Sequence, residues 1–296
     1  MNRIELQELV RERQVGQINR RDFLLRATAV LGSAAAANTL LAACTQVQEG
    51  TPRLVLDTSQ PPAEPDLQTS GDLQKGIVTY AGPEGQELMG YLARNPGAGP
   101  QPAVIVIQEW WGLNNHIKDV ADRFAAAGYV ALAPDLYHGQ VATEPDEARK
   151  LAMELGMDDA VGEIQAGMAY LRAQDFTTGK IGIVGFCMGG GLVLQTAVAD
   201  DSLDAAVPFY GQAVNPTMAG RITAPVLSFL GSRDRISADS YEAMHEALEA
   251  NGVPNHFQLY EGAQHAFFND TRDAYDPTAA ADAWSRVLNW FNEYLR

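Results

Sequence analysis

The sequence predicts an α/β protein with one domain, built on a doubly wound, mostly parallel β-sheet with helices on both faces. Strand-like and helix-like segments alternate from about residue 75 to residue 296, which is typical of this class. The segment PAVIVIQEW at 102–110 is a continuous run of apolar and β-branched residues, as in a parallel strand buried on both faces. With 296 residues, 46% of them hydrophobic, the chain can bury one large core.

The first elements form the edge of the sheet. Segments 76–82 and 87–94 alternate apolar and polar residues, which predicts an edge hairpin. The buried strand at 102–110 follows. Residues 115–128 have helical spacing and end on Gly128, a favourable helix terminus, and the next strand is expected at 129–137.

The alternation then continues to the end of the chain without an internal repeat. Two helices are expected at 145–155 and 157–174, followed by the central strand at 180–186 with a helix directly behind it. The later strands are expected at 205–211, 224–232 and 256–262, and the later amphipathic helices at 240–252 and 278–296.

Residues 1–44 have the order of a bacterial export signal: basic residues, then an apolar stretch, then small residues. Arg20, Arg21, Phe23 and Leu24 resemble the twin-arginine type, which exports folded proteins. An amphipathic N-terminal helix is the alternative interpretation.

The segment LAAC, which ends at Cys44, resembles the lipobox of bacterial lipoproteins, where the cysteine is lipidated. Ordinary signal cleavage beside an incidental cysteine is the alternative. Residues 45–74 are rich in Pro, Gln, Ser and Thr, which predicts a flexible tether. We therefore expect an extracytoplasmic protein anchored to the bacterial cell membrane, with its catalytic domain at 75–296.

The charge balance excludes one class of partner. The chain carries a net charge of −16, and the residues after 44 carry −18. Such a surface repels phosphate backbones, so we expect no nucleic-acid partner. No metal-ligand spacing connects the histidines outside the site proposed below, and no cofactor is expected; these histidines are His116, His138, His245 and His256.

The strongest candidate for chemistry is Cys187, in the segment GFCMG. Gly185 and Gly189 flank it in the pattern G-x-nucleophile-x-G, with cysteine in the position usually held by serine. The tight turn from strand to helix needs small residues on both sides, and the helix N-terminus favours a thiolate. A buried, inert cysteine is the alternative.

Two further residues fall at strand ends in the order expected of a catalytic triad. Asp234 follows the strand at 224–232, and His265 follows the strand at 256–262. In this arrangement His265 takes the thiol proton and later returns it to the leaving group, while Asp234 orients the imidazole ring. Alone, each would be an ordinary loop residue.

Glu109 and the two tryptophans after it form the third part of the site. Glu109 leaves a buried strand directly at the expected active edge, although a salt-bridged loop glutamate is the alternative. The backbone N–H groups of Trp110 and Met188 are expected to form the oxyanion hole. Trp111, with Trp110, is a candidate wall of the substrate pocket.

Five segments together resemble the dienelactone hydrolase (carboxymethylenebutenolidase) family: QEWWGLN, APDLY, GFCMGG, GSRD and HAFF. The resemblance covers residues 75–296. It implies the α/β-hydrolase fold and cleavage of small esters or lactones by Cys187, Asp234 and His265 through an acyl-thioenzyme. It also implies that Glu109 pairs with the resting thiol and that Tyr137 lies near the site.

The chain departs from this family at the substrate carboxylate. Where the dienelactone enzymes carry an arginine shortly after the histidine, this sequence has Asn269, and Arg149 is the nearest candidate for a second arginine. The expected substrate is therefore a small ester, lactone or thioester of undefined charge. A thioesterase or acyl transferase, and a non-catalytic ligand-binding lipoprotein on the same fold, are the alternatives.

Overall fold

The computed structural model describes residue 26 and residues 67–97 and 99–296. The chain divides into two units, Met1–Gln60 and Pro61–Arg296, and the fold below is that of the second. The predicted export signal, the predicted lipidation site at Cys44 and most of the predicted tether lie outside the described residues. No helix among the described residues has the length and apolar character needed to cross a membrane.

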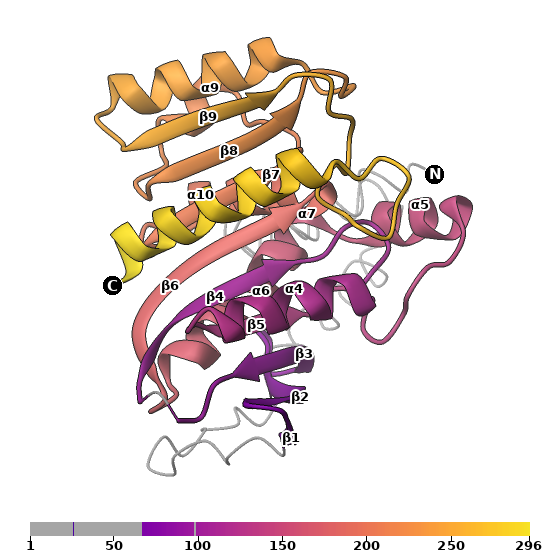
Figure 1. Cartoon of the computed structure of the whole chain (residues 1–296), viewed down its shortest axis with the longest axis vertical. Helices are drawn as coiled ribbons and strands as arrows, with labels where there is room; N and C mark the ends of the chain where they lie inside the picture. Colours follow the sequence, from indigo (N-terminus) through magenta and orange to yellow (C-terminus); the bar gives the residue numbers. More distant parts are fainter. Residues whose placement is uncertain (1–25, 27–66, 98) are drawn as a thin grey trace. The chain divides into compact units, whose positions relative to one another are not determined.

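A nine-stranded sheet forms the centre of the unit, with its strands in the order β1-β2-β3-β5-β4-β6-β7-β8-β9 (Figure 1). The first pairings, up to β3 with β5, are antiparallel, and every pairing from β5 onward is parallel. The strands are β1 (Gln68–Ser70), β2 (Leu73–Ala81), β3 (Glu87–Arg94), β4 (Gln101–Ile107), β5 (Val130–Pro134), β6 (Thr177–Phe186), β7 (Ala205–Phe209), β8 (Val226–Gly231) and β9 (Asn255–Tyr260). The predicted doubly wound, mostly parallel sheet is confirmed.

Helices cover both faces of this sheet. The helices are α4 (Asn115–Ala126), α5 (Pro145–Glu154), α6 (Met157–Arg172), α7 (Met188–Ala199), α8 (Pro216–Ala219), α9 (Ala238–Ala250) and α10 (Pro277–Leu295). Figure 1 shows α4 and α10 in front of the sheet and α6 and α7 behind it. Gly182 of β6 makes room for α10, because a Cβ atom there would lie 2.7 Å from the Phe291 ring.

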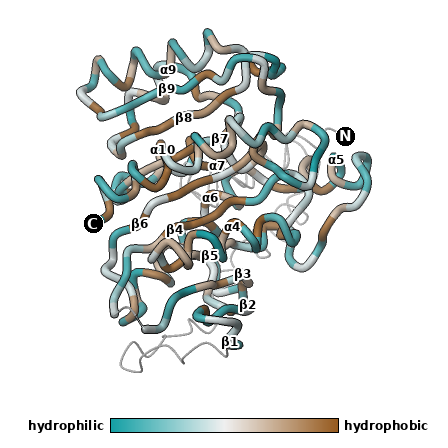
Figure 2. The backbone as a smooth tube through the Cα atoms, viewed as in Figure 1, coloured by the Kyte–Doolittle hydropathy of each residue, from teal (hydrophilic) through white to brown (hydrophobic). Residues whose placement is uncertain are grey.

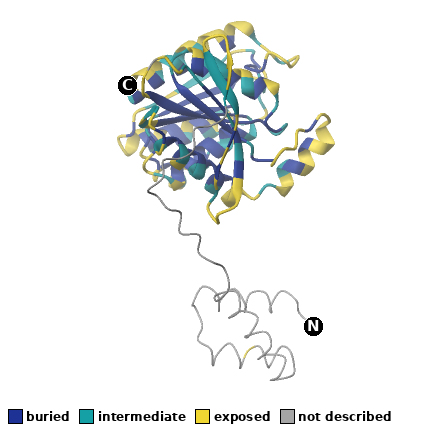
Figure 3. Ribbon diagram, turned by 90° about the horizontal axis from the view of Figure 1, so that it is seen from below, coloured by how far each residue is buried: buried dark blue, intermediate teal, exposed yellow. Residues whose placement is uncertain are grey.

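The core lies where the sequence predicted continuous apolar strands. Every residue of β4, β5, β7 and β8 is buried. Figure 2 shows these strands as predominantly hydrophobic, and Figure 3 shows the buried residues concentrated in the sheet with exposed residues on the outer faces. Burial of apolar surface on both sides of a parallel sheet is the main stabilising term of this fold.

The structure differs from the prediction at the first edge of the sheet. Residues 68–74, assigned to the tether, form β1 and the beginning of β2, which pair antiparallel across a turn at Gly71. Gly71 has a φ of +63°, a conformation that glycine adopts without strain. The exposed, polar sequence of β1 has no apolar alternation, so pattern alone could not identify it.

Candidate active site

Cys187 lies at the sharp turn between β6 and α7. Its φ of 56° and ψ of −116° are strained for a residue with a side chain, and it is half-buried at the N-terminus of α7. A Cβ atom at Gly185 would lie 2.3 Å from the carbonyl oxygen of Gly189, and one at Gly189 would lie 2.5 Å from that of Gln108. The pattern G-x-C-x-G is therefore a steric requirement of this turn.

His265 and Asp234 lie beside Cys187 at the same edge of the sheet. His265 Nδ1 is 2.8 Å from Asp234 Oδ2, and the Cys187 thiol lies close enough to the imidazole to raise its pKa. The Asp234 side chain is only 1% exposed, and its second oxygen accepts a hydrogen bond from the backbone N–H of Ile236 at 3.0 Å. Three groups distant in sequence thus lie together at one edge of the sheet.

These neighbours change the protonation of His265. Burial alone would lower the pKa of the imidazole, but the hydrogen bonds to Asp234 and Cys187 and the negative charges of both outweigh it and raise that pKa to about 10. The arrangement therefore favours an imidazolium ion between a sulfur and a carboxylate.

Glu109 lies behind this series and is 2% exposed. Its Oε2 accepts a 2.7 Å hydrogen bond from the side-chain amide of Asn269, which is fully buried. The Asn269 Oδ1 accepts hydrogen bonds from the backbone N–H and the hydroxyl of Thr271, so its amide nitrogen faces Glu109. Burial raises the pKa of Glu109, against the lowering effects of Asn269, Arg272 and His265.

We expect Glu109→Gln to become increasingly more stable than the wild type as the pH rises. A carboxyl whose pKa is raised in the folded state binds more protons folded than unfolded, so the free energy of unfolding falls as the pH rises above its ordinary value of 4.5. Glutamine removes that titration and still accepts from Asn269. Urea unfolding between pH 5 and pH 8 measures the difference, with the exposed Glu87→Gln as control. A difference that does not change with pH contradicts this expectation.

The two predicted oxyanion-hole residues lie on opposite sides of Cys187 in sequence and are connected by Tyr137. The Tyr137 hydroxyl donates to the carbonyl oxygen of Trp110 at 3.1 Å and lies 3.5 Å from Met188 Sδ. Met188 is the first residue of α7, where a backbone N–H has no partner within its own helix. Burial, with the charge of Cys187, raises the pKa of Tyr137 to about 12, so its hydroxyl stays a donor.

A cavity of about 500 Å³ opens onto the sulfur. Its walls combine the catalytic candidates with two tryptophans and a loop rich in arginine. It is lined by Glu109, Trp110, Trp111, Cys187, Arg233, Asp234, Arg235, Ile236, Gln264, His265 and Ala266. Trp111, a predicted wall residue, is in this lining.

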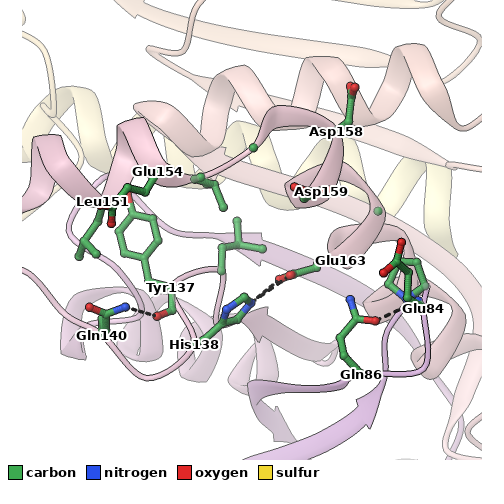
Figure 4. A pocket seen from close by; sticks show the side chains of 15 residues that line it. Glu84, Gln86, Tyr137, His138, Gln140, Leu151, Glu154, Asp158, Asp159 and Glu163 are labelled. Atoms are coloured by element: carbon green, nitrogen blue, oxygen red, sulfur yellow. Dashed lines mark hydrogen bonds and ion pairs between the residues drawn. The ribbon is translucent and has the colours of Figure 1, made fainter. Parts of the chain in front are cut away.

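Three residues predicted to contact substrate are not among the residues that line this cavity. Asn269 is buried behind Glu109, where its side-chain amide forms hydrogen bonds with the Glu109 carboxylate and with Thr271. Arg149 is exposed on α5 and pairs with Asp146 at 3.1 Å. Tyr137 points its ring into a separate cavity, shown in Figure 4, which contains none of the triad and in which His138 contacts Glu163. Sequence proximity to the site motifs did not predict side-chain direction.

Sequence reasoning missed four residues at the site. Tyr210 follows β7, has a φ of 37°, and places its fully buried ring 5.1 Å from that of His265. Arg233 and Arg235 flank Asp234 in the cavity wall, and the Arg272 guanidinium lies 4.0 Å from the centre of the Trp111 ring. Asp234 was predicted because it directly follows a strand, and the same criterion applies to Tyr210. No motif or residue spacing in the sequence pointed to Arg272.

Among the residues that the structure describes, no three His, Cys, Asp or Glu side chains are arranged to hold a metal ion. The expected pairing of Glu109 with the resting thiol also has no counterpart among the described contacts, because the thiol faces His265 and the carboxylate faces Asn269.

The chain is similar to several known proteins. Residues 88–295 match the dienelactone hydrolase family. Protein usf of Aquifex pyrophilus is 38% identical over 222 residues, which span 71% of this chain and 95% of that protein. A protein of Aquifex aeolicus (strain VF5), provisionally named carboxymethylenebutenolidase, is 37% identical over 223 residues, which span 72% of this chain and 96% of that protein.

Solved structures give the same result. A dienelactone hydrolase-like promiscuous phosphotriesterase from metagenomic libraries, P91, superimposes with a TM-score of 0.70 at 27% identity, covering 76% of this chain and all of that one. A structure from Klebsiella pneumoniae, provisionally named dienelactone hydrolase, gives a TM-score of 0.68 at 31% identity, covering 74% of this chain and 99% of that one.

Proposed function

The chain belongs to the dienelactone hydrolase family of ester and lactone hydrolases, and on that premise we propose that it cleaves its substrate with Cys187, His265 and Asp234 through an acyl-thioenzyme. The single observation that carries this proposal is that Cys187, His265 and Asp234 line one cavity of about 500 Å³, with His265 Nδ1 2.8 Å from Asp234 Oδ2. Nucleophile, base and orienting acid are the parts that nucleophilic acyl transfer requires.

In the first half of the reaction, the Cys187 sulfur attacks the carbonyl carbon, and the carbonyl oxygen becomes an oxyanion. The backbone N–H groups of Trp110 and Met188 stabilise that charge. When the oxyanion collapses, the bond from carbon to the leaving oxygen breaks. The His265 imidazolium donates its proton to that oxygen, and a thioester remains on Cys187.

In the second half, a water molecule attacks the thioester carbon and gives its proton to His265. Collapse of the second oxyanion breaks the carbon–sulfur bond and releases the carboxylic acid. Asp234 keeps the ring oriented throughout and stabilises its positive form. Tyr137 holds the Trp110 carbonyl, and so the loop that carries one of the two N–H donors.

Glu109 takes a supporting role in this proposal. Its carboxyl accepts a hydrogen bond from the Asn269 amide, and burial, the largest influence on its pKa, favours the neutral form against the charges of Arg272 and His265. A carboxyl shifted toward its neutral form repels the thiolate less than one with an ordinary pKa. Glu109 is thus a positioning group that limits electrostatic repulsion around the thiolate.

The acyl-thioenzyme can be tested directly. Acid quenching during turnover of 4-nitrophenyl acetate should give a protein mass increased by one acetyl group, located on Cys187 by peptide mapping. The Cys187→Ala variant is the control and should acquire no such group. If the wild type hydrolyses the ester and the peptide that contains Cys187 stays unmodified under every quench condition, the nucleophile is another group.

The imidazolium predicts a particular pH dependence of alkylation. Iodoacetamide should modify Cys187 faster at neutral pH in the wild type than in His265→Gln, because the raised pKa of His265 keeps a positive ring beside the sulfur and so favours the reactive thiolate. The two rates should approach each other toward alkaline pH, where a thiol ionises without help from a neighbouring cation. Identical profiles for the two proteins would favour a binding protein without a reactive thiol.

The same proposal includes the location of the enzyme. We propose export through the twin-arginine-like signal at 20–24 and a lipid anchor on Cys44, which is supported by the sequence LAAC. Intact mass of the protein from the membrane fraction is the test. A chain that begins at Cys44 and carries acyl groups is the expected product, and an unmodified chain rejects the anchor.

A further inference from the structure

Two connections meet at the active edge, and each carries a part of the proposed catalytic machinery. The connection from β4 to α4, residues 108–114, contains Trp110, whose N–H is one of the two proposed oxyanion donors. It is here called the oxyanion loop. The connection from β9 to α10, residues 261–276, contains His265 and is here called the histidine loop. The two loops are far apart in the sequence, so their alignment depends on contacts between their side chains.

The histidine loop contacts the residues on both sides of Trp110. The Asn269 amide donates to Glu109 Oε2 at 2.7 Å, and the Arg272 guanidinium lies 4.0 Å from the centre of the Trp111 ring. Because a peptide group is planar and trans, the Trp110 N–H points away from the Glu109 carbonyl in the same peptide group. The direction of this N–H therefore follows the position of Glu109.

Asp270, which directly follows Asn269, connects the histidine loop to α4. Its Oδ1 lies 3.2 Å from Nδ1 of His116, the second residue of α4. A carboxylate only accepts hydrogen bonds, so the Nδ1 proton is on His116 and the imidazole is the donor. His116 is 5% exposed, and its Nε2 has no hydrogen-bond partner among the described residues. Burial lowers the pKa of His116 against the raising effect of Asp270, so the donor is a neutral ring.

His116 is itself fixed against the turn that carries the nucleophile. Its ring packs edge-on against Phe186, with 6.4 Å between the ring centres and 67° between the ring planes. Phe186 directly precedes Cys187, and Phe268 of the histidine loop stacks on the same ring at 5.2 Å. Both phenylalanines are buried. The His116 imidazole is therefore a rigid point, close to the nucleophile, against which the histidine loop is aligned.

We propose that Asp270 and His116 are positioning residues that align the Trp110 N–H with the attacking sulfur. This inference rests on the proposed function, because it concerns the oxyanion that forms in that reaction. Neither side chain is among those that line the cavity, so the pair acts through its neighbours. The hydrogen bond fixes the place of Asn269, which directly precedes Asp270. Asn269 in turn fixes Glu109, which directly precedes Trp110.

Alignment of this kind has a specific kinetic effect. The oxyanion develops in the transition states and not in the bound ester, so a displaced N–H lowers kcat and kcat/KM by the same factor and leaves KM unchanged. Alkylation of Cys187 by iodoacetamide forms no oxyanion, so its rate does not depend on the Trp110 N–H. Comparison of the two reactions therefore separates a displaced oxyanion donor from a disturbed pair of Cys187 and His265.

Substitution of Asp270 provides the test, because its side chain is 53% exposed and its removal leaves no cavity in the core. Asp270→Ala removes the acceptor, whereas Asp270→Asn keeps an oxygen that can accept from His116. The matched control is Asp273→Ala, which removes an exposed carboxylate from the same loop. Steady-state kinetics on 4-nitrophenyl acetate and the rate of alkylation by iodoacetamide are measured in the wild type and in the three variants.

We expect Asp270→Ala to lower kcat by about tenfold to a hundredfold, less than complete loss of an oxyanion donor, and to leave KM and the alkylation rate unchanged. Asp270→Asn should recover most of the lost rate, and Asp273→Ala should equal the wild type. Wild-type kinetics in Asp270→Ala, no recovery in Asp270→Asn, or an equal loss of hydrolysis and alkylation would each overturn the positioning role. Hydrolysis that depends on Cys187 would still support the proposed function.

The partner variant shows whether the two residues act through one hydrogen bond. His116→Phe keeps an aromatic ring against Phe186 and removes the donor. It should lower kcat about as much as Asp270→Ala does, and the two substitutions together should lower it no further. Losses that multiply in the double variant would contradict a shared hydrogen bond. If His116→Phe does not fold, the Asp270 variants decide the question alone.

A wild type that hydrolyses no ester contradicts the proposed function, and the positioning role is then decided without catalysis. 5-Fluorotryptophan labels the four tryptophans of the chain, and the ¹⁹F signals of the oxyanion loop are assigned with Trp110→Phe and Trp111→Phe. Asp270→Ala should shift both of these signals, whereas Asp273→Ala should leave them in place. Signals that keep their wild-type positions in Asp270→Ala reject the positioning role.

Discussion

Replacing Cys187 by alanine is expected to lower kcat for small activated esters by a factor on the order of 10⁴ to 10⁶, the range found when a catalytic triad loses its nucleophile. The reason is local: His265 has no second nucleophile beside it among the described wall residues of the cavity. Initial rates on 4-nitrophenyl acetate, corrected for the spontaneous reaction, measure the loss.

The fold should remain intact in this variant. Alanine keeps a Cβ atom at the φ of 56°, so the backbone strain is unchanged, and the thiol removed is only half-buried. Circular dichroism and a thermal melt similar to those of the wild type are therefore required before the kinetics are interpreted. A well-folded Cys187→Ala protein with more than about a tenth of the wild-type rate would refute the nucleophile, because that loss is far below the range expected for a triad.

The second large effect is structural. Gly189→Ala is expected to lower the free energy of unfolding by about 3 kcal/mol or more, and with it the yield of folded protein. The new Cβ atom would lie 2.5 Å from the carbonyl oxygen of Gln108 and 2.7 Å from that of Ile107. Both contacts are to backbone at the end of β4, so no side-chain rotation can relieve them. Urea unfolding monitored by tryptophan fluorescence measures the change.

Gly191, in the same helix, is a matched control. A Cβ atom there would approach nothing closer than 3.6 Å, an ordinary van der Waals distance. Gly191→Ala should therefore leave the stability unchanged or raise it by up to about 1 kcal/mol, since alanine favours the helix more than glycine does. Equal destabilisation by both substitutions would indicate a general sensitivity of α7, and not the packing of the turn against β4.

The turn around Cys187 is a part of the fold that the sequence predicts well. The pattern around Cys187 predicted a strand, a strained turn and a helix, and the structure has β6, Cys187 with a positive φ, and α7 at these places. The pattern is local, because the turn itself demands small residues within two positions of the cysteine. The buried strands were equally predictable, because a strand with apolar residues on both faces is typical of a parallel sheet that is covered by helices on both sides.

The order of the motifs along the chain also predicted which strand ends would meet. Glu109, Cys187, Asp234 and His265 each follow a parallel strand, and parallel strands end at one edge of the sheet. The expectation followed from topology alone. It needed no knowledge of distances, and the 2.8 Å contact of His265 with Asp234 is consistent with it.

The fold and the residue types at the active edge could thus be predicted from the sequence, because both follow from local patterns and strand direction. The direction of the side chains could not be predicted and is known from the three-dimensional packing. It turned Asn269 inward to Glu109, left Arg149 exposed on α5, and brought Arg272 over Trp111. Such choices depend on packing between segments far apart in the chain, where small differences in space and hydrogen bonding select a rotamer, and no spacing within one segment encodes them.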